Sequence, residues 1–228
     1  MLLKAFVDYL RYERAASERT VTEYEADLKA FESFYKSLSD DLSWETIDAD
    51  IAREWMVEMM ERGLKATSVN RRLSALRSFY RFLYRRGYVE HDPVHLLTAP
   101  KAEKRLPAFV REQEMDRLLD GDDMFEDSFA GRRDHLIIAM FYETGLRVSE
   151  LVGLDVKDVN LDASTLRVTG KGNKQRIVPF GEELLHLIYI YREERVARVP
   201  DDRQPFFISE KGERLRTATV RKMVREKL

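Results

Sequence analysis

Apolar residues in the first hundred positions recur every three or four residues, which is the spacing of one face of an α-helix. Thr20 and Glu23 predict a capping box at the start of the second of four helices. No alternating pattern typical of a strand precedes residue 100. The predicted apolar stripes are Leu3, Phe6, Val7 and Leu10; Tyr24, Leu28, Phe31 and Phe34; residues 50–62, ending at Gly63; and Val69, Leu73, Leu76, Tyr80 and Leu83.

The periodicity stops in the segment "HDPVHLLTAPKAEKRLPAF", which carries Pro93, Pro100 and Pro107 among charged residues. Prolines and a loss of periodicity mark a linker between domains. We therefore predict a helical domain over residues 1–92, a linker over 93–107 and a second domain over 108–228.

The second domain is predicted to mix helices with short strands. In "TLRVTG" and "QRIVPF" apolar and polar residues alternate around a glycine-rich turn, which predicts a β-hairpin. The fold class is mainly α with a small β-hairpin or sheet: an all-helical N-terminal domain followed by an α+β domain. The other predicted elements are helices near 111–119, 132–143 and 181–199, a turn at Gly145, a short helix after it, a strand at 205–209 and a last helix over 217–228.

Composition excludes several classes of function. The 228 residues are 44% hydrophobic and include no cysteine, so disulfides, thiolate metal sites and a cysteine nucleophile are excluded. The absence of a long apolar run and of a signal-peptide pattern predicts a cytoplasmic protein with no membrane partner. His91 and His95 have helical spacing, but Asp92 and Pro93 between them interrupt a helix, so we predict no metal and no cofactor.

Charge is distributed unevenly along the chain. The net charge is −2, yet the segment from Arg62 to Gly87 holds eight Lys or Arg and no acid. Segregation of this kind predicts a basic face that binds nucleic acid. The alternative is a solvated basic helix on a protein that binds other proteins.

The fourth helix carries the candidate DNA-reading residues. Asn70, Ser74, Arg77 and Arg81 share one face, and in the major groove Arg can read guanine and Asn can read adenine. Flanking cations can instead hold phosphates, which gives affinity without sequence information. The residues predicted to flank the face are Arg71 and Arg72, with Arg85 and Arg86 near the helix end.

Lys171 lies between two glycines in the predicted hairpin turn "GKGNK". A nucleotide-binding P-loop needs Gly-Lys-Ser/Thr leading from a strand into a helix, whereas here Gly172 and a second strand follow. Flanking glycines allow positive φ and a close approach of the backbone to a ligand. From this turn alone, a solvated lysine and a functional lysine both remain possible.

Arg147 opens a short helix in "FYETGLRVSELVGL". A cation in the first turn opposes the helix dipole, whereas an anion there would meet the guanidinium and free backbone N–H groups. The alternative is a structural salt bridge, because Glu143 and Glu150 are four and three residues away.

Taken together, "ETGLRVSELVGL" and "VTGKGNKQRIVPF" resemble the catalytic domain of the tyrosine recombinases, close to the Xer-type recombinases and phage-type integrases. The segments "ERTVTEYEADLKAFESFY" and "SVNRRLSALRSFYRFLYRRG" are similar to the family's SAM-like core-binding domain. The resemblance implies that Arg147 is the first catalytic arginine and that Lys171 is the proton-donating hairpin lysine.

The resemblance also implies the reaction and the partners. In the family a tyrosine attacks a DNA phosphodiester and gives a 3′-phosphotyrosyl intermediate, with no metal required. The implied partners are double-stranded DNA, held in a C-clamp between the two domains, and a second copy or a paralogous recombinase in a synaptic tetramer. We add Thr20 and Lys174 to the candidate DNA contacts.

The resemblance stops before the family's remaining catalytic boxes. The sequence contains no His-x-x-Arg, and its ten tyrosines end at Tyr191, inside a predicted helix. We therefore expect a truncated recombinase that binds DNA without cutting it. The alternatives are a non-catalytic DNA-binding regulator or relic on the same fold, a helical interaction protein, and a nucleotide-phosphate enzyme that uses Lys171.

Overall fold

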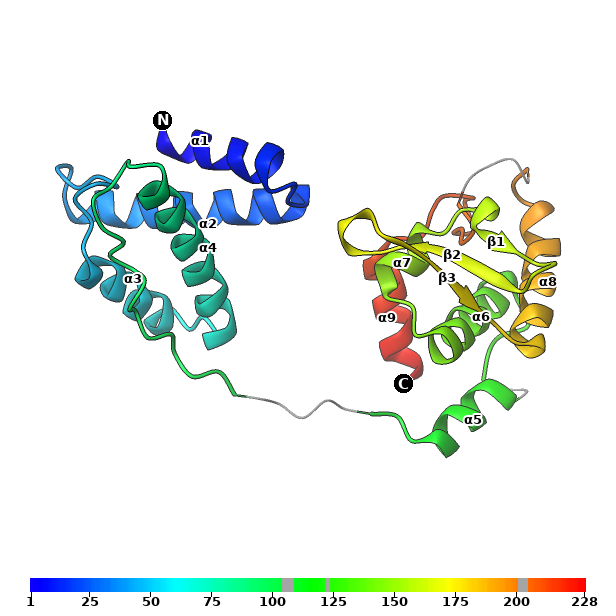
Figure 1. Ribbon diagram of the computed structural model, residues 1–228. Coiled ribbons are helices and arrows are strands. Elements are labelled where there is room, and N and C mark those ends of the chain that lie inside the picture. The colour runs from blue at the N-terminus through cyan, green and yellow to red at the C-terminus, as the bar shows by residue number, and fades with distance from the viewer. Residues whose placement is uncertain (104–108, 122–123, 201–204) are drawn as a thin grey trace. The chain divides into compact units, whose positions relative to one another are not determined.

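The computed structural model describes residues 1–103, 109–121, 124–200 and 205–228, except the side chains of Asp120 and Lys171. The chain divides into two compact units, residues 1–106 and 107–228 (Figure 1). Each unit has its own hydrophobic core. No helix among the described residues is both long and apolar enough to cross a membrane.

The described elements of the first unit are all helical, as predicted, and those of the second combine helices with a small antiparallel sheet (Figure 1). The first unit contains α1 (Leu2–Asp8), a π-helical turn (Tyr9–Glu13), α2 (Glu18–Leu38), α3 (Ala49–Glu61) and α4 (Ala66–Arg85). The second contains α5 (Glu112–Asp120), α6 (Phe129–Thr144), α7 (Val148–Gly153), a 3₁₀ turn (Val156–Asp158), β1 (Val159–Asn160), β2 (Thr165–Thr169), a 3₁₀ turn (Lys171–Asn173), β3 (Gln175–Pro179), α8 (Glu182–Val196) and α9 (Thr217–Lys227).

Aromatic side chains fill the centre of the first unit. Phe31 of α2 packs with its ring centroid 5.8 Å from that of Trp44 and 4.9 Å from that of Trp55. Tyr80 of α4 is buried and donates a hydrogen bond to the carbonyl of Trp44. The apolar stripes of α2, α3 and α4 therefore meet in one core.

The predicted capping box at the start of the second helix is wrong. The N-cap of α2 is Ser17, whose Oγ accepts a hydrogen bond from the backbone N–H of Thr20 at 3.2 Å. Glu23 instead accepts a hydrogen bond from Arg19, one turn before it. Serine and threonine are both good N-cap residues. With Ser17 as the N-cap, the helix starts at Glu18, so Glu18 and Arg19 precede Thr20 within it.

Part of the predicted linker packs on the first unit. Val94 and Leu97 are buried in its core. Two residues of α4 hold this segment: the side-chain amide of Asn70 donates to the carbonyl of Pro100 at 3.0 Å, and Arg77 donates to the carbonyl of Leu97. Residues 104–107 of the predicted linker lie outside the described residues.

A buried ion pair joins α2 to α4. Asp27 is 5% exposed, and its two carboxylate oxygens accept hydrogen bonds from Arg71 at 2.5 and 2.9 Å. The Nε of Arg72 lies 3.6 Å from the same carboxylate. The buried charge of Asp27 thus depends on cations that the sequence analysis assigned to phosphate binding.

The sheet of the second unit has the strand order β1-β2-β3, with Leu166 opposite Val178 in the central hairpin. Leu166 and Val168 of β2 are buried in the second core, in agreement with the predicted alternation. Helix α6 packs against α8, and α7 packs against both β2 and α9. The start of α7 is therefore held against the hairpin.

The predicted strand at 205–209 is wrong. This segment pairs only through isolated bridges, Asp155 with Pro205 and Ile208 with Arg214. Phe206, Phe207 and Ile208 are all buried in succession. Their burial comes from packing into the second core and not from a place in the sheet.

We predict that Arg71→Ala lowers the free energy of unfolding of the first unit by roughly 1–3 kcal/mol, because the buried Asp27 carboxylate loses two hydrogen bonds and keeps, among the described residues, only Arg72 at 3.6 Å. Urea unfolding followed by tryptophan fluorescence measures this, since Trp44 and Trp55 both lie in the first core. The control is Arg81→Ala on the same helix, an exposed arginine with no carboxylate partner among the described residues. Equal unfolding midpoints for Arg71→Ala and the wild type would contradict this role of Arg71.

Candidate active site

The turn between α6 and α7 brings Arg147 to the surface. Gly145 ends α6 in the left-handed region at φ 61°, where glycine has no Cβ to strain, and the predicted turn is confirmed. Arg147 is the N-cap of α7, one position before the helix itself. Leu146 and Leu151 are buried on either side and fix this short helix to the core.

Glu150 is the centre of the site. Its carboxylate is buried, with 2% of the side chain exposed. It accepts hydrogen bonds from the backbone N–H of Arg147 at 2.9 Å and from Nη1 of Arg147 at 3.0 Å. Nη1 and Nη2 of Arg176, near the start of β3, donate to its two oxygens at 2.8 and 3.0 Å. One carboxylate thus connects the start of α7 to the hairpin.

The charge of Glu150 is stabilised by these partners. Hydrogen bonds from Arg176, and then from the backbone and side chain of Arg147, lower the pKa of Glu150 from 4.5 to about 2, although burial acts in the opposite direction. Glu150 is therefore ionised across the physiological pH range and holds both guanidinium groups.

Arg147 is paired and still accessible. The alternative that the sequence left open, a salt bridge, forms with Glu150, whereas Glu143 accepts from the backbone N–H of Gly181. The Arg147 side chain is nevertheless 71% exposed. Because a guanidinium has five N–H donors and Glu150 engages one of them, the others face solvent and can hold an anion.

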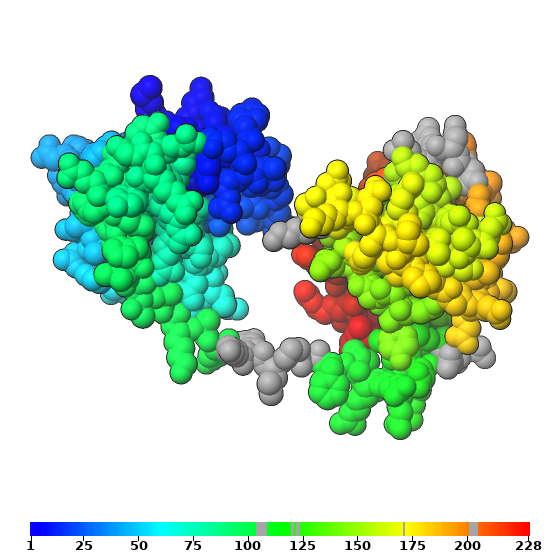
Figure 2. Space-filling view, in the orientation of Figure 1, coloured from blue at the N-terminus to red at the C-terminus, as the bar shows by residue number. Residues whose placement is uncertain are grey.

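The predicted hairpin is confirmed, and its turn stands out from the second unit (Figures 1 and 2). The N–H of Gly170 donates to the carbonyl of Lys174 at 2.8 Å, and Gly172 has a φ of 75°. A Cβ added at Gly170 would lie 3.1 Å from Oε1 of Glu150, so glycine lets the turn approach the carboxylate. Lys171 follows at once in the chain, and its side chain lies outside the described part of the structure.

This arrangement suits the binding of a phosphate ester. An exposed guanidinium, fixed from behind by a buried carboxylate, offers a rigid fork of donors for phosphate oxygens. Arg176, which follows the turn that carries Lys171, is hydrogen-bonded to the same carboxylate, and Gly170 leaves room for the turn beside it. From the sequence, Glu150 is only a possible partner of Arg147, and no local pattern indicates Arg176, whose place beside Glu150 depends on the hairpin register.

Tyr191, the last tyrosine of the chain, has a structural role. It is fully buried, its hydroxyl donates to the carbonyl of Phe206 at 3.0 Å, and it accepts from the N–H of Ile208 at 3.0 Å. Burial raises its pKa to about 12. These contacts hold the hydroxyl inside the core, where it cannot attack a substrate.

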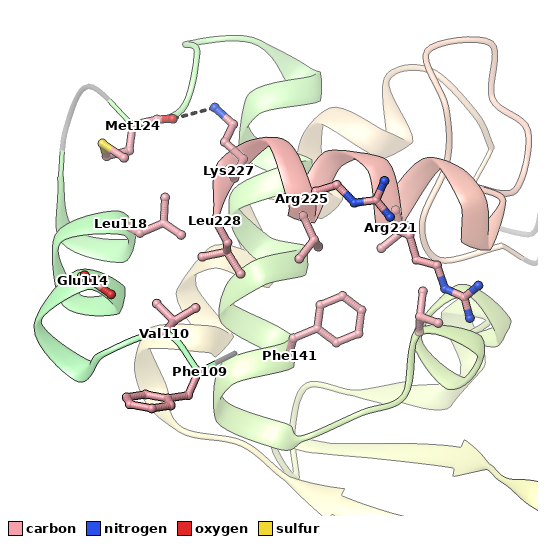
Figure 3. Close-up of a pocket in the computed structure, with 13 residues that line it drawn as sticks. Phe109, Val110, Glu114, Leu118, Met124, Phe141, Arg221, Arg225, Lys227 and Leu228 are labelled. Carbon is pink, nitrogen blue, oxygen red and sulfur yellow. Dashed lines mark hydrogen bonds between the residues drawn. The ribbon is translucent and has the colours of Figure 1, made fainter. Parts of the chain in front are cut away.

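An apolar groove lies between α5 and α9 (Figure 3). Its cavity volume is about 760 Å³, and Figure 3 shows Phe141 and Leu118 on its walls with Arg221 and Arg225 on α9. Lys227 closes one end by donating to the carbonyl of Met124 at 2.8 Å. The apolar lining does not suit a phosphate, so we do not assign phosphate binding to this groove. No pattern in the sequence indicates this groove.

The candidate DNA contacts fall into two groups in the structure. Asn70, Arg71 and Arg77 make the contacts within the first unit described above, and Arg72 lies beside Asp27. Ser74 and Arg81 are exposed on α4, Lys174 is exposed at the end of the hairpin turn, and Thr20 is half-buried in the first turn of α2. Their roles toward DNA stay predictions.

Both units of the chain are similar to known proteins. Residues 3–87 match the N-terminal SAM-like domain of phage integrases, and residues 108–228 match the phage integrase family. The chain is 38% identical over 224 residues to tyrosine recombinase XerC of Azotobacter vinelandii, covering 98% of this chain and 74% of that protein. It is 33% identical to tyrosine recombinase XerC of Bacillus subtilis, covering 96% and 72% respectively.

Solved structures share the fold. A lambda integrase dimer bound to a core DNA site aligns with a TM-score of 0.73 at 18% identity, covering 99% of this chain and 79% of that chain. The Tn1549 transposon integrase in complex with circular-intermediate DNA aligns with a TM-score of 0.70 at 17% identity, covering 99% and 78%.

We predict that Glu150→Gln loosens the hairpin at pH 7, because it removes the charge that holds Arg147 and Arg176. Hydrogen exchange at the Gly170 amide measures the free energy of opening, which should fall by roughly 1–3 kcal/mol. A carboxyl group whose pKa is lowered by folding stabilises the fold fully at pH values above its unfolded-state pKa. This stabilisation is lost as the pH falls through the lower, folded-state pKa. The difference from wild type should therefore shrink between pH 4.5 and about 2.

Tryptophan fluorescence is the internal control for this experiment, since Trp44 and Trp55 report only on the first unit and should not change. A Gly170 amide that is equally protected in both proteins at pH 7, or a difference that persists undiminished at pH 2, would show that the Glu150 charge does not hold the turn.

Proposed function

Because this chain belongs to the phage integrase family of tyrosine recombinases, we propose that it serves site-specific recombination by binding duplex DNA around a scissile phosphate. The observation that supports this most is the exposed guanidinium of Arg147, fixed by the buried Glu150 carboxylate beside the hairpin turn. A site built in this way accepts an anion without rearranging.

We infer a division of labour within the site. Arg147 binds the non-bridging oxygens of the phosphate and stabilises the charge that develops on them during attack. When a tyrosine oxygen bonds to phosphorus and the bond to the 5′ oxygen breaks, Lys171 gives its proton to that oxygen and regains it in ligation. Glu150 touches no substrate in this scheme and positions Arg147.

We propose that these 228 residues bind DNA without cutting it. They contain no His-x-x-Arg sequence, and the last tyrosine is the buried Tyr191. The chain spans about three quarters of the length of the XerC relatives it matches. The second candidate function, a non-catalytic DNA-binding regulator on the same fold, is favoured by the same missing residues.

The proposed partner is double-stranded DNA, contacted by α4 in the first unit and by the Arg147 site in the second. The lambda and Tn1549 integrases that share this fold are DNA complexes, and the lambda structure is a dimer. We propose on this basis that the chain, or a form of it with the remaining catalytic residues, associates with a second copy or a paralogous recombinase. The cytoplasmic location predicted from the sequence belongs to the same proposal.

Incubation with a nicked suicide duplex tests the function directly. The 228-residue chain should retard the duplex in a native gel and should form no covalent adduct in a denaturing gel, because it contains no His-x-x-Arg box and its last tyrosine, Tyr191, is buried. A failure to bind duplex DNA would overturn the proposal. A covalent adduct would reveal a nucleophile that we have not identified.

The roles of Arg147 and Lys171 are testable in a form of the protein that carries a His-x-x-Arg box and a tyrosine nucleophile. Arg147→Ala should abolish the phosphotyrosyl adduct and leave DNA binding largely intact. Lys171→Ala should slow cleavage less when sulfur replaces the 5′ leaving oxygen, because a thiolate leaves without a proton. Equal rate losses on the oxygen and sulfur substrates would exclude proton donation by Lys171.

A further inference from the structure

A polar cleft on the first unit joins the end of the π-helical turn to α4. Its cavity volume is about 540 Å³. Four arginines and two serines line most of it: Arg14, Arg77, Arg81 and Arg85, with Ser74 and Ser78. We call this site the arginine cleft.

The charge of the arginine cleft is unbalanced. No acidic residue lines it, and among the described residues Arg14, Arg81 and Arg85 have no carboxylate partner. Neighbouring arginines are paired, for instance Arg71 with Asp27 and Arg86 with Glu13. Like charges gathered on a concave surface repel one another and attract anions from solution. The cleft therefore favours an anionic ligand.

The spacing along α4 indicates an extended ligand. Arg77, Arg81 and Arg85 are four residues apart, so their Cα atoms follow one side of the helix at intervals of about 6 Å. One strand of DNA carries a phosphate about every 3.4 Å along the helix axis. A row of this length meets several successive phosphates, whereas a free phosphate would engage only part of it.

Two features prepare the cleft for phosphate oxygens. The hydrogen bond from Arg77 to the carbonyl of Leu97 fixes one guanidinium and leaves its other donors unused. Arg14 comes from a different element and approaches the same cleft as Arg81. Because arginines from two elements line one concavity, the geometry suits a backbone lying in the cleft better than a helix face inserted among base edges.

We propose that the arginine cleft holds the phosphodiester backbone of one DNA strand, with Arg14, Arg81 and Arg85 as phosphate contacts. Arg81 then binds phosphate and does not read a base, in contrast to the prediction from the sequence. This proposal rests on the proposed function, because it takes duplex DNA as the ligand.

The experiment measures the affinity of the full chain for duplex DNA by fluorescence anisotropy over a series of KCl concentrations, with two duplexes of unrelated sequence. The variants are Arg14→Gln, Arg81→Gln and Arg85→Gln. The matched control is Arg53→Gln, which removes the same charge from α3, where Arg53 pairs with Asp50. Tryptophan fluorescence confirms that each variant keeps the folded first unit.

Each cleft variant should weaken binding several-fold on both duplexes and reduce the slope of log affinity against log salt by about 1, since each phosphate contact releases about one counterion. Arg53→Gln should change neither. If the wild type binds and all three cleft variants bind with the same affinity and salt slope as the wild type, the arginine cleft is wrong and the proposed function still stands. A loss for Arg81→Gln on only one duplex would assign base reading to Arg81 and contradict the cleft. No binding by the wild type would overturn both proposals.

Discussion

A single buried carboxylate organises the second unit. Loss of the cationic partners of Glu150 would destabilise the fold, because an ionised carboxylate without partners in a protein interior costs several kcal/mol of folding free energy. Glu150 therefore connects the start of α7 to Arg176 at the start of β3, directly after the turn that bears Lys171. The contact with Glu150 also positions Arg147, whose side chain is otherwise exposed. The requirements of the fold thus leave an exposed guanidinium at the surface, where we propose that a DNA phosphate binds.

The first unit uses arginine in two ways. Asp27 binds Arg71 because a buried acid needs a cation, whereas Arg14 and Arg85 have no such partner among the described residues. This difference reconciles a net charge of −2 with the proposed binding of DNA. Acidic residues neutralise arginines at helix contacts and leave a cationic cleft elsewhere, and affinity for DNA depends on that local charge more than on the sum.

The fold could be predicted from the sequence to the extent that it depends on local periodicity. The apolar stripes give the helices, and the glycines around Lys171 give the hairpin. The strand predicted at 205–209 is wrong because a run of buried apolar residues has the same appearance in a strand and in a loop packed on a core. The contacts of Arg176 with Glu150 and of Asn70 with Pro100 join residues 26 and 30 positions apart, and no local pattern specifies such pairs.

Arg147 can bind a DNA phosphate in the proposed way only if Glu150 holds its guanidinium in place. The guanidinium Nε–H signals of ¹⁵N-labelled protein test this claim when duplex DNA is added. In the wild type the Arg147 and Arg81 signals should both shift. In Glu150→Gln the Arg147 shift should be lost while the Arg81 shift remains. An Arg147 signal that DNA leaves unchanged in the wild type, or that shifts equally in both proteins, would contradict the account.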